Sequence, residues 1–228
     1  SRAEDYEGVK NALDFEKWNP VADEHIAEPF SADDFSGKSA DKTDLQERLS
    51  GHEDIEGLHG SLTVNPQAIL LGVIARLTEQ KGMNLVLEMS QQLLKDNPDV
   101  QLVILGQGDA ELETAFASLA RQYAGRVAFL QIQDEDWARR IFAGSDFFLS
   151  PSKREPFGLA PRQAQLYGAI AIVRAVDGQM DVVVDPQPSP DQTITTTTTT
   201  TAGVTTTTVA DERVINRDDF RISAQLAK

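Results

Sequence analysis

Residues 69–95 have the sequence ILLGVIARLTEQKGMNLVLEMSQQLLK, and this stretch decides the fold class. It opens on seven mostly apolar residues, Ile69–Ala75, which suit a strand that is buried on both faces. A short polar loop follows, and residues Met83–Lys95 then repeat apolar side chains with the period of an amphipathic helix. A buried strand, a short loop and a helix make one βα unit of a parallel sheet.

The same unit recurs across residues 61–185, with short connections of the kind that α/β folds use. Further buried strands are predicted at Val100–Leu105, Val127–Gln131, Phe147–Pro151 and Ala169–Val173. Further helices are predicted at Ala110–Tyr123, Asp136–Ala143 and Arg162–Tyr167. The sequence therefore predicts an α/β fold in which residues 61–185 form a doubly wound, Rossmann-like parallel sheet.

The segment before this domain, residues 1–60, is acidic. It contains sixteen Asp and Glu residues against six Lys and Arg residues, so it holds −10 of the formal net charge of −15. Few apolar residues recur there at regular spacing, which predicts a helical turn or two at Asp41–Leu49 and a loop at His52–Gly60. We interpret residues 1–60 as an irregular, linker-like segment.

The segment after the domain, residues 186–228, is rich in proline and threonine. Threonine runs occupy residues 195–201 and 205–208. Threonine favours strands, but a run of identical polar residues has no alternation that would fix a strand register. The sequence therefore predicts a low-complexity tail that is disordered or forms a ragged edge strand.

Composition excludes several classes of function. A net charge of −15 argues against binding to nucleic acid, and no apolar run is long enough to cross a bilayer. The sequence has no cysteine, which fits a reducing compartment such as the cytoplasm or a plastid stroma. Its three histidines all precede the α/β segment, so we expect neither a bound transition metal nor a resident cofactor.

Candidate site residues lie in the loops after the strands, where doubly wound sheets bind ligands. Arg76 and Lys81 follow the first strand and stand just before Gly82 at a helix start, a spacing that lets two cations hold a diphosphate. An ordinary solvated loop explains the same two charges about equally well. Gly106 and Gly108 allow a ligand close to the backbone, although a plain turn is the better interpretation of a lone G-x-G.

A second candidate loop, residues 151–159, follows the fourth strand and holds Glu155 between two prolines. This carboxylate is suited to accept hydrogen bonds from sugar hydroxyls or to stabilise positive charge at an anomeric carbon. Taken by itself, Glu155 is better explained by a salt bridge to Arg154 or Lys153. At the helix after Gly108, we expect Asp109 to cap the first turn.

Several motifs, in the order in which they occur in that family, resemble the glycogen and starch synthases. RLTEQKG at residues 76–82 is similar to the family motif R-L-x-x-Q-K-G, and PSKREPFGL at residues 151–159 is similar to P-S-R-F-E-P-C-G-L. The other matching stretches are residues 11–14, 18–20, 31–38 and 141–146. The resemblance spans roughly residues 8–185 and corresponds to the C-terminal, donor-binding half of the family's chain.

The resemblance implies one half of a GT-B glycosyltransferase, which transfers glucose from ADP-glucose to an α-1,4-glucan with retention. It implies catalytic roles for Arg76, Lys81 and Glu155, with no metal. The donor-binding residues that it implies, together with the glycine loop, are Arg76, Gln80, Lys81, Gly106, Gly108, Glu155, Phe157, Gly158 and Leu159. The implied partners are a nucleotide-sugar donor, an α-glucan acceptor and an N-terminal domain, for which a separate chain is one source.

The sequence also departs from the family pattern. Gln133 and Asp134 stand where the family has an aromatic ring against adenine, and Asp177 lies in a loop that would face the diphosphate. The family's first domain has no counterpart in these residues. Two hypotheses therefore stay open: a donor-binding half that is inactive alone, or a non-catalytic domain with weak or no nucleotide-sugar binding. An unrelated Rossmann-like nucleotide enzyme is a weaker third alternative.

Overall fold

The computed structural model describes residues 11–51, 54–183, 196–201, 204–209 and 220–222. Within these ranges the main sheet has seven strands: β1 (Leu58–Leu62), β2 (Ile69–Ile74), β3 (Val100–Leu105), β4 (Arg126–Leu130), β5 (Phe147–Ser150), β6 (Ile170–Arg174) and β9 (Phe220–Ile222). Its helices are α1 (Ser36–Arg48), α2 (Met83–Asp96), α3 (Ala110–Gln122), α4 (Glu135–Gly144) and α5 (Leu159–Leu166), with short 3-10 helices η2 (Glu79–Lys81) and η3 (Asp177–Asp181). Two further strands, β7 (Thr196–Thr201) and β8 (Val204–Val209), pair only with each other.

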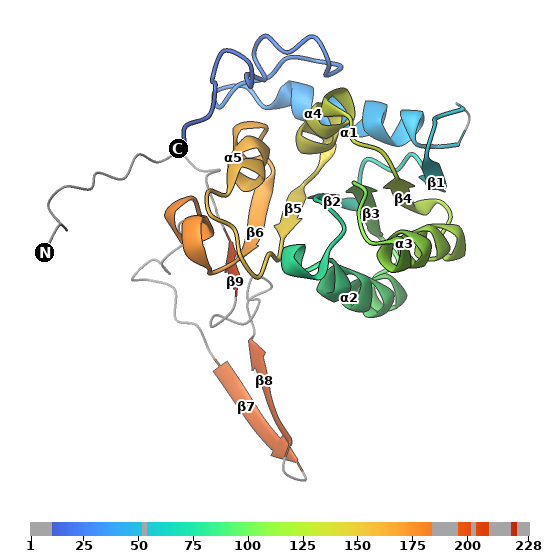
Figure 1. Ribbon diagram of the computed structural model, residues 1–228, viewed down its shortest axis with the longest axis vertical. Coiled ribbons are helices and arrows are strands. Elements are labelled where there is room, and N and C mark those ends of the chain that lie inside the picture. Colours follow the sequence, from blue (N-terminus) through green and yellow to red (C-terminus); the bar gives the residue numbers. More distant parts are fainter. Residues whose placement is uncertain (1–10, 52–53, 184–195, 202–203, 210–219, 223–228) are drawn as a thin grey trace, which may run out of the picture.

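The main sheet has the strand order β1-β4-β3-β2-β5-β6-β9 (Figure 1). Strands β2 to β6 run parallel, and the two outer strands β1 and β9 run antiparallel to their neighbours. The chain proceeds outward from β2 through β3 to β4, and then crosses back to place β5 and β6 on the other side. This reversal confirms the predicted doubly wound α/β fold, and it puts the switch point between β2 and β5.

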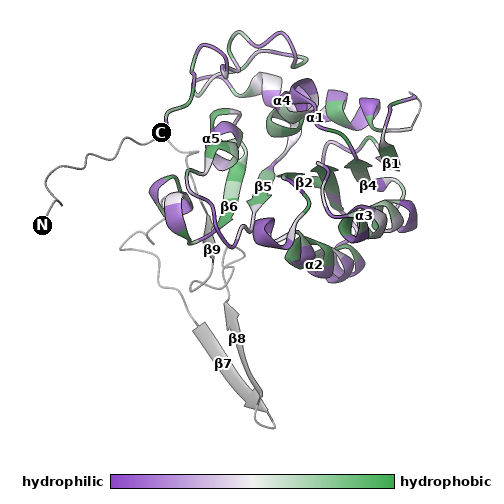
Figure 2. Cartoon of the chain, in the orientation of Figure 1, coloured by the Kyte–Doolittle hydropathy of each residue, from purple (hydrophilic) through white to green (hydrophobic). Residues whose placement is uncertain are grey.

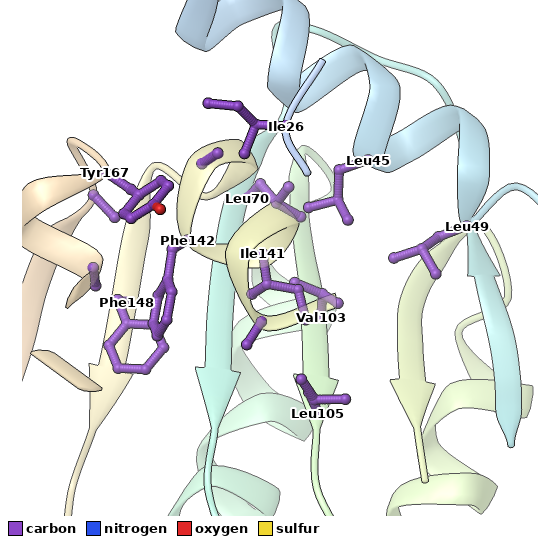
Figure 3. Close-up of a cluster of buried hydrophobic side chains, with 14 of the residues drawn as sticks. Ile26, Leu45, Leu49, Leu70, Val103, Leu105, Ile141, Phe142, Phe148 and Tyr167 are labelled. Carbon is purple, nitrogen blue, oxygen red and sulfur yellow. The ribbon is translucent and has the colours of Figure 1, made fainter. Parts of the chain in front are cut away.

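Each face of the sheet carries its own apolar core, because successive strand residues point to opposite faces. On one face Leu70 and Val103 pack with residues of α1, α4 and α5 (Figure 3). On the other face Leu71 and Leu102 pack with residues of α2 and α3. Figure 2 shows apolar strands between helices whose outer surfaces are hydrophilic. None of the helices in the described part of the chain has the length and apolar content that crossing a bilayer requires.

Helix α1 docks onto the domain largely through polar side chains. Lys38 donates hydrogen bonds from Nζ to the carbonyl oxygens of Ala143 (2.7 Å) and Tyr167 (2.8 Å), at the ends of α4 and α5. Lys42 forms an ion pair with Asp146 at 2.7 Å. These contacts place Leu45 and Leu49, both fully buried, in the core shared with α4 (Figure 3).

The acidic segment is therefore more ordered than its sequence predicts. Asp41–Leu49 was expected to form a turn or two, but α1 is a complete helix of 13 residues. The loop predicted at His52–Gly60 is wrong at its end, because β1 begins at Leu58 and pairs with β4. Both predictions missed because the segment is anchored by hydrogen bonds and ion pairs, which leave no apolar periodicity in the sequence.

Three further expectations are corrected by the structure. Asp109 makes no capping hydrogen bond; the amide of Gly108 instead donates to the carboxylate of Glu113 at 2.8 Å. The fifth helix begins at Leu159 instead of Arg162, since proline is tolerated in a first turn. The threonine runs, predicted to be disordered or a ragged edge, form the antiparallel pair β7–β8, in which Thr196 lies opposite Val209.

The buried amine of Lys38 makes stability depend on pH. Burial lowers the pKa of this amine from 10.5 to about 8, against the opposing attraction of Asp146 and Asp41. Between these two pH values the unfolded chain binds more protons than the folded one, so stability rises with pH. We expect the free energy of unfolding of the wild type to rise relative to that of Lys38→Met by at most about 3 kcal/mol across this window.

This expectation is checked by urea unfolding at pH 7.5, 9 and 10.5. The exposed Lys95 provides the control, because the wild type and Lys95→Met should keep a constant difference in stability. A constant difference between the wild type and Lys38→Met over the same range would contradict the assignment.

Candidate functional site

Two loops flank the switch point of the sheet and are fastened to each other. The first connects β2 to α2, and the second connects β5 to α5. The amide of Lys153 donates to the carbonyl oxygen of Gln80 at 2.8 Å, and the side chain of Lys153 pairs with Glu79. Gly82 permits this contact, because a Cβ there would lie 2.3 Å from the carbonyl oxygen of Pro151. The two loops are therefore packed against each other at the carboxyl edge of the sheet.

Lys81 and Glu155 meet across these loops. The Nζ atom of Lys81 lies 2.6 Å from Oε2 of Glu155, and their side chains are 29% and 17% exposed. The structure thus brings together two predicted site residues that are far apart in sequence. It also identifies the ion-pair partner of Glu155 as Lys81, whereas the sequence suggested Arg154 or Lys153. Lys153 pairs with Glu79 instead.

Arg76 occupies the start of the same first loop and is exposed. Among the described residues, its guanidinium has neither an ion-pair partner nor a hydrogen-bond partner. It lines a pocket of about 270 Å³ at the carboxyl ends of β2, β3 and β4. The residues that line this pocket are Ile74, Ala75, Arg76, Leu105, Gly106, Gln107, Ile132, Gln133 and Asp134. Most of the surface that lines the pocket is apolar, and Arg76, unpaired within the described residues, stands beside it. The pocket therefore suits an apolar group that carries an anion.

The glycine loop after β3 is packed against the first loop. A Cβ at Gly106 would lie 1.9 Å from the carbonyl oxygen of Ala75, and one at Gly108 would lie 2.3 Å from that of Leu77. The amide of Leu77 also donates to the carbonyl oxygen of Gln107 at 2.9 Å. Close approach of two backbones therefore accounts for both glycines, and Gly106 additionally lines the pocket.

The second loop ends where α5 begins. Gly158 adopts a left-handed conformation, with φ of 65°, and immediately precedes Leu159. Phe157 is 45% exposed and lies on the surface of this loop. The free amides of a helix start are a favourable place for an anion. The donor-binding role that the family resemblance implies for residues 157–159 stays a prediction.

Asp177 is directed toward the second loop. Its carboxylate accepts a hydrogen bond from the amide of Glu155 at 3.2 Å, and the amide of Gly178 donates to the carbonyl oxygen of Glu155 at 2.9 Å. Asp177 has a φ of 43°, which aspartate tolerates better than most residues do. Asp177, which the sequence analysis placed in a loop that would face the diphosphate, thus accepts a hydrogen bond from the backbone of Glu155.

Some lining residues were not predicted as part of the site. Gln107 was noticed only as the middle residue of the G-x-G, and Ile132 matched no motif. Gln133 and Asp134 were noticed only as departures from a family pattern. These residues line one pocket because β3 and β4 are neighbouring strands and their carboxyl ends lie side by side. Within the described residues, no group of three or more His, Asp or Glu side chains is arranged to hold a metal ion.

Comparison with known proteins shows the family to which this chain belongs. Residues 54–197 match the model of the family described as glycosyl transferases group 1, which is more than half of the chain. The chain belongs to the group 1 glycosyltransferases. This match confirms the broader class, glycosyltransferase, to which the sequence resemblance pointed.

Curated relatives of this glycosyltransferase domain include bacterial glycogen synthases. It is 42% identical over 184 residues to the glycogen synthase of Anaeromyxobacter dehalogenans, a match that covers 81% of this chain and 36% of that protein. It is 41% identical over 176 residues to the glycogen synthase of Streptococcus equi, covering 77% and 34%. The chain therefore spans about a third of the length of these relatives.

Solved structures agree with the fold of this group 1 domain. The catalytic domain of starch synthase IV from Arabidopsis thaliana, bound to ADP and acarbose, superposes with a TM-score of 0.67 at 30% identity, covering 80% of this chain and 35% of that one. The C-terminal domain of a group 1 family protein from Francisella tularensis has a TM-score of 0.50 at 16% identity and covers 76% of each chain. The second likeness concerns the fold alone.

Proposed function

We propose that this glycosyltransferase domain binds the donor of a retaining glucosyltransferase, which transfers glucose from ADP-glucose to an α-1,4-glucan. The observation that carries the proposal is the pair of cations on one loop at the switch point of the sheet. Arg76, which has no partner among the described residues, lines the pocket, and Lys81 lies five residues on, at the end of η2 just before α2. The ADP in the related starch synthase supports the choice of nucleotide.

In this proposal each group has a physical task. The aliphatic pocket takes the base, and the guanidinium of Arg76 and the amine of Lys81 bind the diphosphate. The same two cations stabilise the negative charge that develops on the leaving nucleotide as the glycosidic bond breaks. Gln80, Glu155 and the turn at residues 157–159 lie on the sugar side of the diphosphate, with the start of α5 contributing a favourable dipole.

A titration calorimeter measures the binding directly. We expect ADP to bind residues 1–228 with a dissociation constant in the millimolar range or tighter, and UDP to bind more weakly. Heat of binding that is absent at millimolar ADP would contradict the proposal. Such a result would favour the alternative, a non-catalytic domain, for which the polar Gln133 and Asp134 at the pocket are the specific observation.

Transfer is a separate expectation. The matched region covers only about a third of the glycogen synthases that this chain resembles, and orienting an acceptor against the donor needs groups on both sides of the reacting bond. We expect residues 1–228 alone to incorporate no labelled glucose from ADP-glucose into glycogen. Incorporation above the level of a Lys81→Met control would overturn this part of the proposal.

A further inference from the structure

The contact between Lys81 and Glu155 has a consequence for which ligand the site prefers. We propose that this ion pair makes the site favour a sugar-bearing nucleoside diphosphate over the free nucleoside diphosphate. The inference rests on the proposed function, because it assigns a selectivity to the same donor site. Glu155 is its specificity-determining residue.

The geometry fixes the carboxylate more firmly than the amine. Glu155 is the more buried partner, and its backbone is held on both sides by Asp177 and Gly178. Pro156 follows it and restricts the chain further. Lys81 has a long flexible stem, so its amine can turn toward a ligand while the carboxylate stays in place. With the amine where the structure has it, 2.6 Å from Oε2 of Glu155, a phosphate oxygen that contacts Nζ of Lys81 lies within about 6 Å of that carboxylate oxygen.

At that separation, the charge on the terminal phosphate decides how strongly the carboxylate of Glu155 repels the ligand. A free terminal phosphate has a second pKa of about 6, so at neutral pH it carries a further negative charge. The carboxylate of Glu155 repels this charge and also competes for the amine of Lys81. A glucosyl ester on the same phosphate removes the second charge, and the repulsion falls.

The sugar also turns the same carboxylate into a favourable partner. An ionised carboxylate is an acceptor with two oxygens, and sugar hydroxyls donate to it in charge-assisted hydrogen bonds. Arg76 cannot make this distinction, because no carboxylate among the described residues is paired with it. Selection against the free diphosphate therefore depends on Glu155. The same repulsion would speed the departure of the nucleoside diphosphate product after transfer.

The test compares ADP with ADP-glucose by calorimetry, for the wild type and for Glu155→Gln. The amide keeps the shape of the side chain and removes its charge. We expect Glu155→Gln to bind ADP about tenfold more tightly than the wild type does. Its affinity for ADP-glucose should stay equal or fall, so the ratio of the two affinities shifts by about tenfold or more toward ADP.

Glu79→Gln is the matched control, because it breaks the neighbouring ion pair with Lys153 and leaves Lys81 and Glu155 intact. Its ratio should equal that of the wild type. Glu155→Asp keeps the charge and provides a second variant if the amide lowers the melting temperature. Its ratio of affinity for ADP to affinity for ADP-glucose should lie closer to that of the wild type than to that of Glu155→Gln.

The outcomes separate the inference from the proposed function. Binding of both ligands by the wild type, with an unchanged ratio in Glu155→Gln, overturns the inference and leaves the donor site standing. A ratio that moves equally in Glu79→Gln also overturns it, since any loss of charge at the loops would then suffice. If neither ligand binds the wild type or the variants, the donor site and the inference both fall.

Discussion

Replacing Lys81 by methionine is expected to weaken the binding of ADP by about a hundredfold. The loss of a charge-assisted contact to a phosphate costs about 1.5–3 kcal/mol, and each 1.4 kcal/mol is tenfold in affinity. Methionine also leaves Glu155, now without its partner at 2.6 Å, as an unopposed negative charge beside the diphosphate. The expected effect is therefore larger than that of Arg76→Ala, which removes a cation that opposes no carboxylate within the described part of the chain and should weaken binding about tenfold.

Lys153→Met is the matched control for this experiment. Lys153 lies on the facing loop and pairs with Glu79, so the substitution removes a lysine from the same edge without touching the proposed diphosphate contacts. We expect its affinity for ADP to stay within about twofold to threefold of the wild type. Equal losses in Lys81→Met and Lys153→Met would show that a general positive field, and not a specific contact, holds the nucleotide.

The second large effect concerns the attachment of the N-terminal segment. Arg139, on α4, contacts the carboxylate of Asp23 at 2.8 Å, and the side chain of Asp23 is 1% exposed. The guanidinium also lies over the ring of Trp18, 4.3 Å from its centroid. We expect Arg139→Met to lower the free energy of unfolding by about 3–5 kcal/mol, because it leaves a buried carboxylate without its cation.

The pKa of Asp23 agrees with this account. Burial opposes its ionisation, but hydrogen bonds from Tyr167, from the amide of His25 and from Arg139 outweigh burial and hold the pKa below its ordinary value. Asp23 is therefore charged in the folded protein at neutral pH, and removing Arg139 takes away the cation that stabilises that buried charge while the hydrogen bonds from Tyr167 and His25 remain.

Arg140→Met is the control for this measurement. Arg140 is the next residue on the same helix, is only partly buried and lies 5.7 Å from the ring of Trp137. Urea unfolding should show a change of less than about 1 kcal/mol for this variant. A loss in Arg139→Met that is no larger than that in Arg140→Met would contradict the role assigned to the buried pair.

Much of the fold could be predicted because the strands β2 to β6 are buried on both faces. A strand such as Val100–Leu105 has six buried residues in a row, and a run of this kind is visible in sequence without knowledge of its neighbours. Helices α2 and α3 were equally visible, because one face of each packs on the sheet and the other faces solvent.

The N-terminal part of the fold could not be predicted in the same way. Helix α1 is held by Lys38, Asp41 and Lys42, whose partners lie up to 129 positions away in the chain. Polar side chains in such numbers look like a solvated surface until their partners are known. Some of the charged residues that suggested a linker are therefore the residues that hold α1 against α4 and α5.

The sequence predicted several of the residues of the candidate site, but it did not predict which of them contact one another. The sequence singled out Lys81 and Glu155 separately, each with a plain alternative. Only the adjacency of β2 and β5 brings their loops together, and that adjacency is a property of the strand order. The packing of Gly106 and Gly108 against the backbone of the first loop was likewise invisible, although a plain turn was the preferred interpretation of the G-x-G.

The central claim, that the carboxyl edge of the sheet binds a nucleoside diphosphate, is tested most directly by amide chemical shifts. The chain is labelled with ¹⁵N and titrated with ADP at neutral pH. The account predicts that the largest shifts occur at residues 76–82 and at Gly106, with smaller ones at Gly158, and that they saturate with one dissociation constant. Unchanged spectra at millimolar ADP, or shifts confined to α1 and β1, would contradict it.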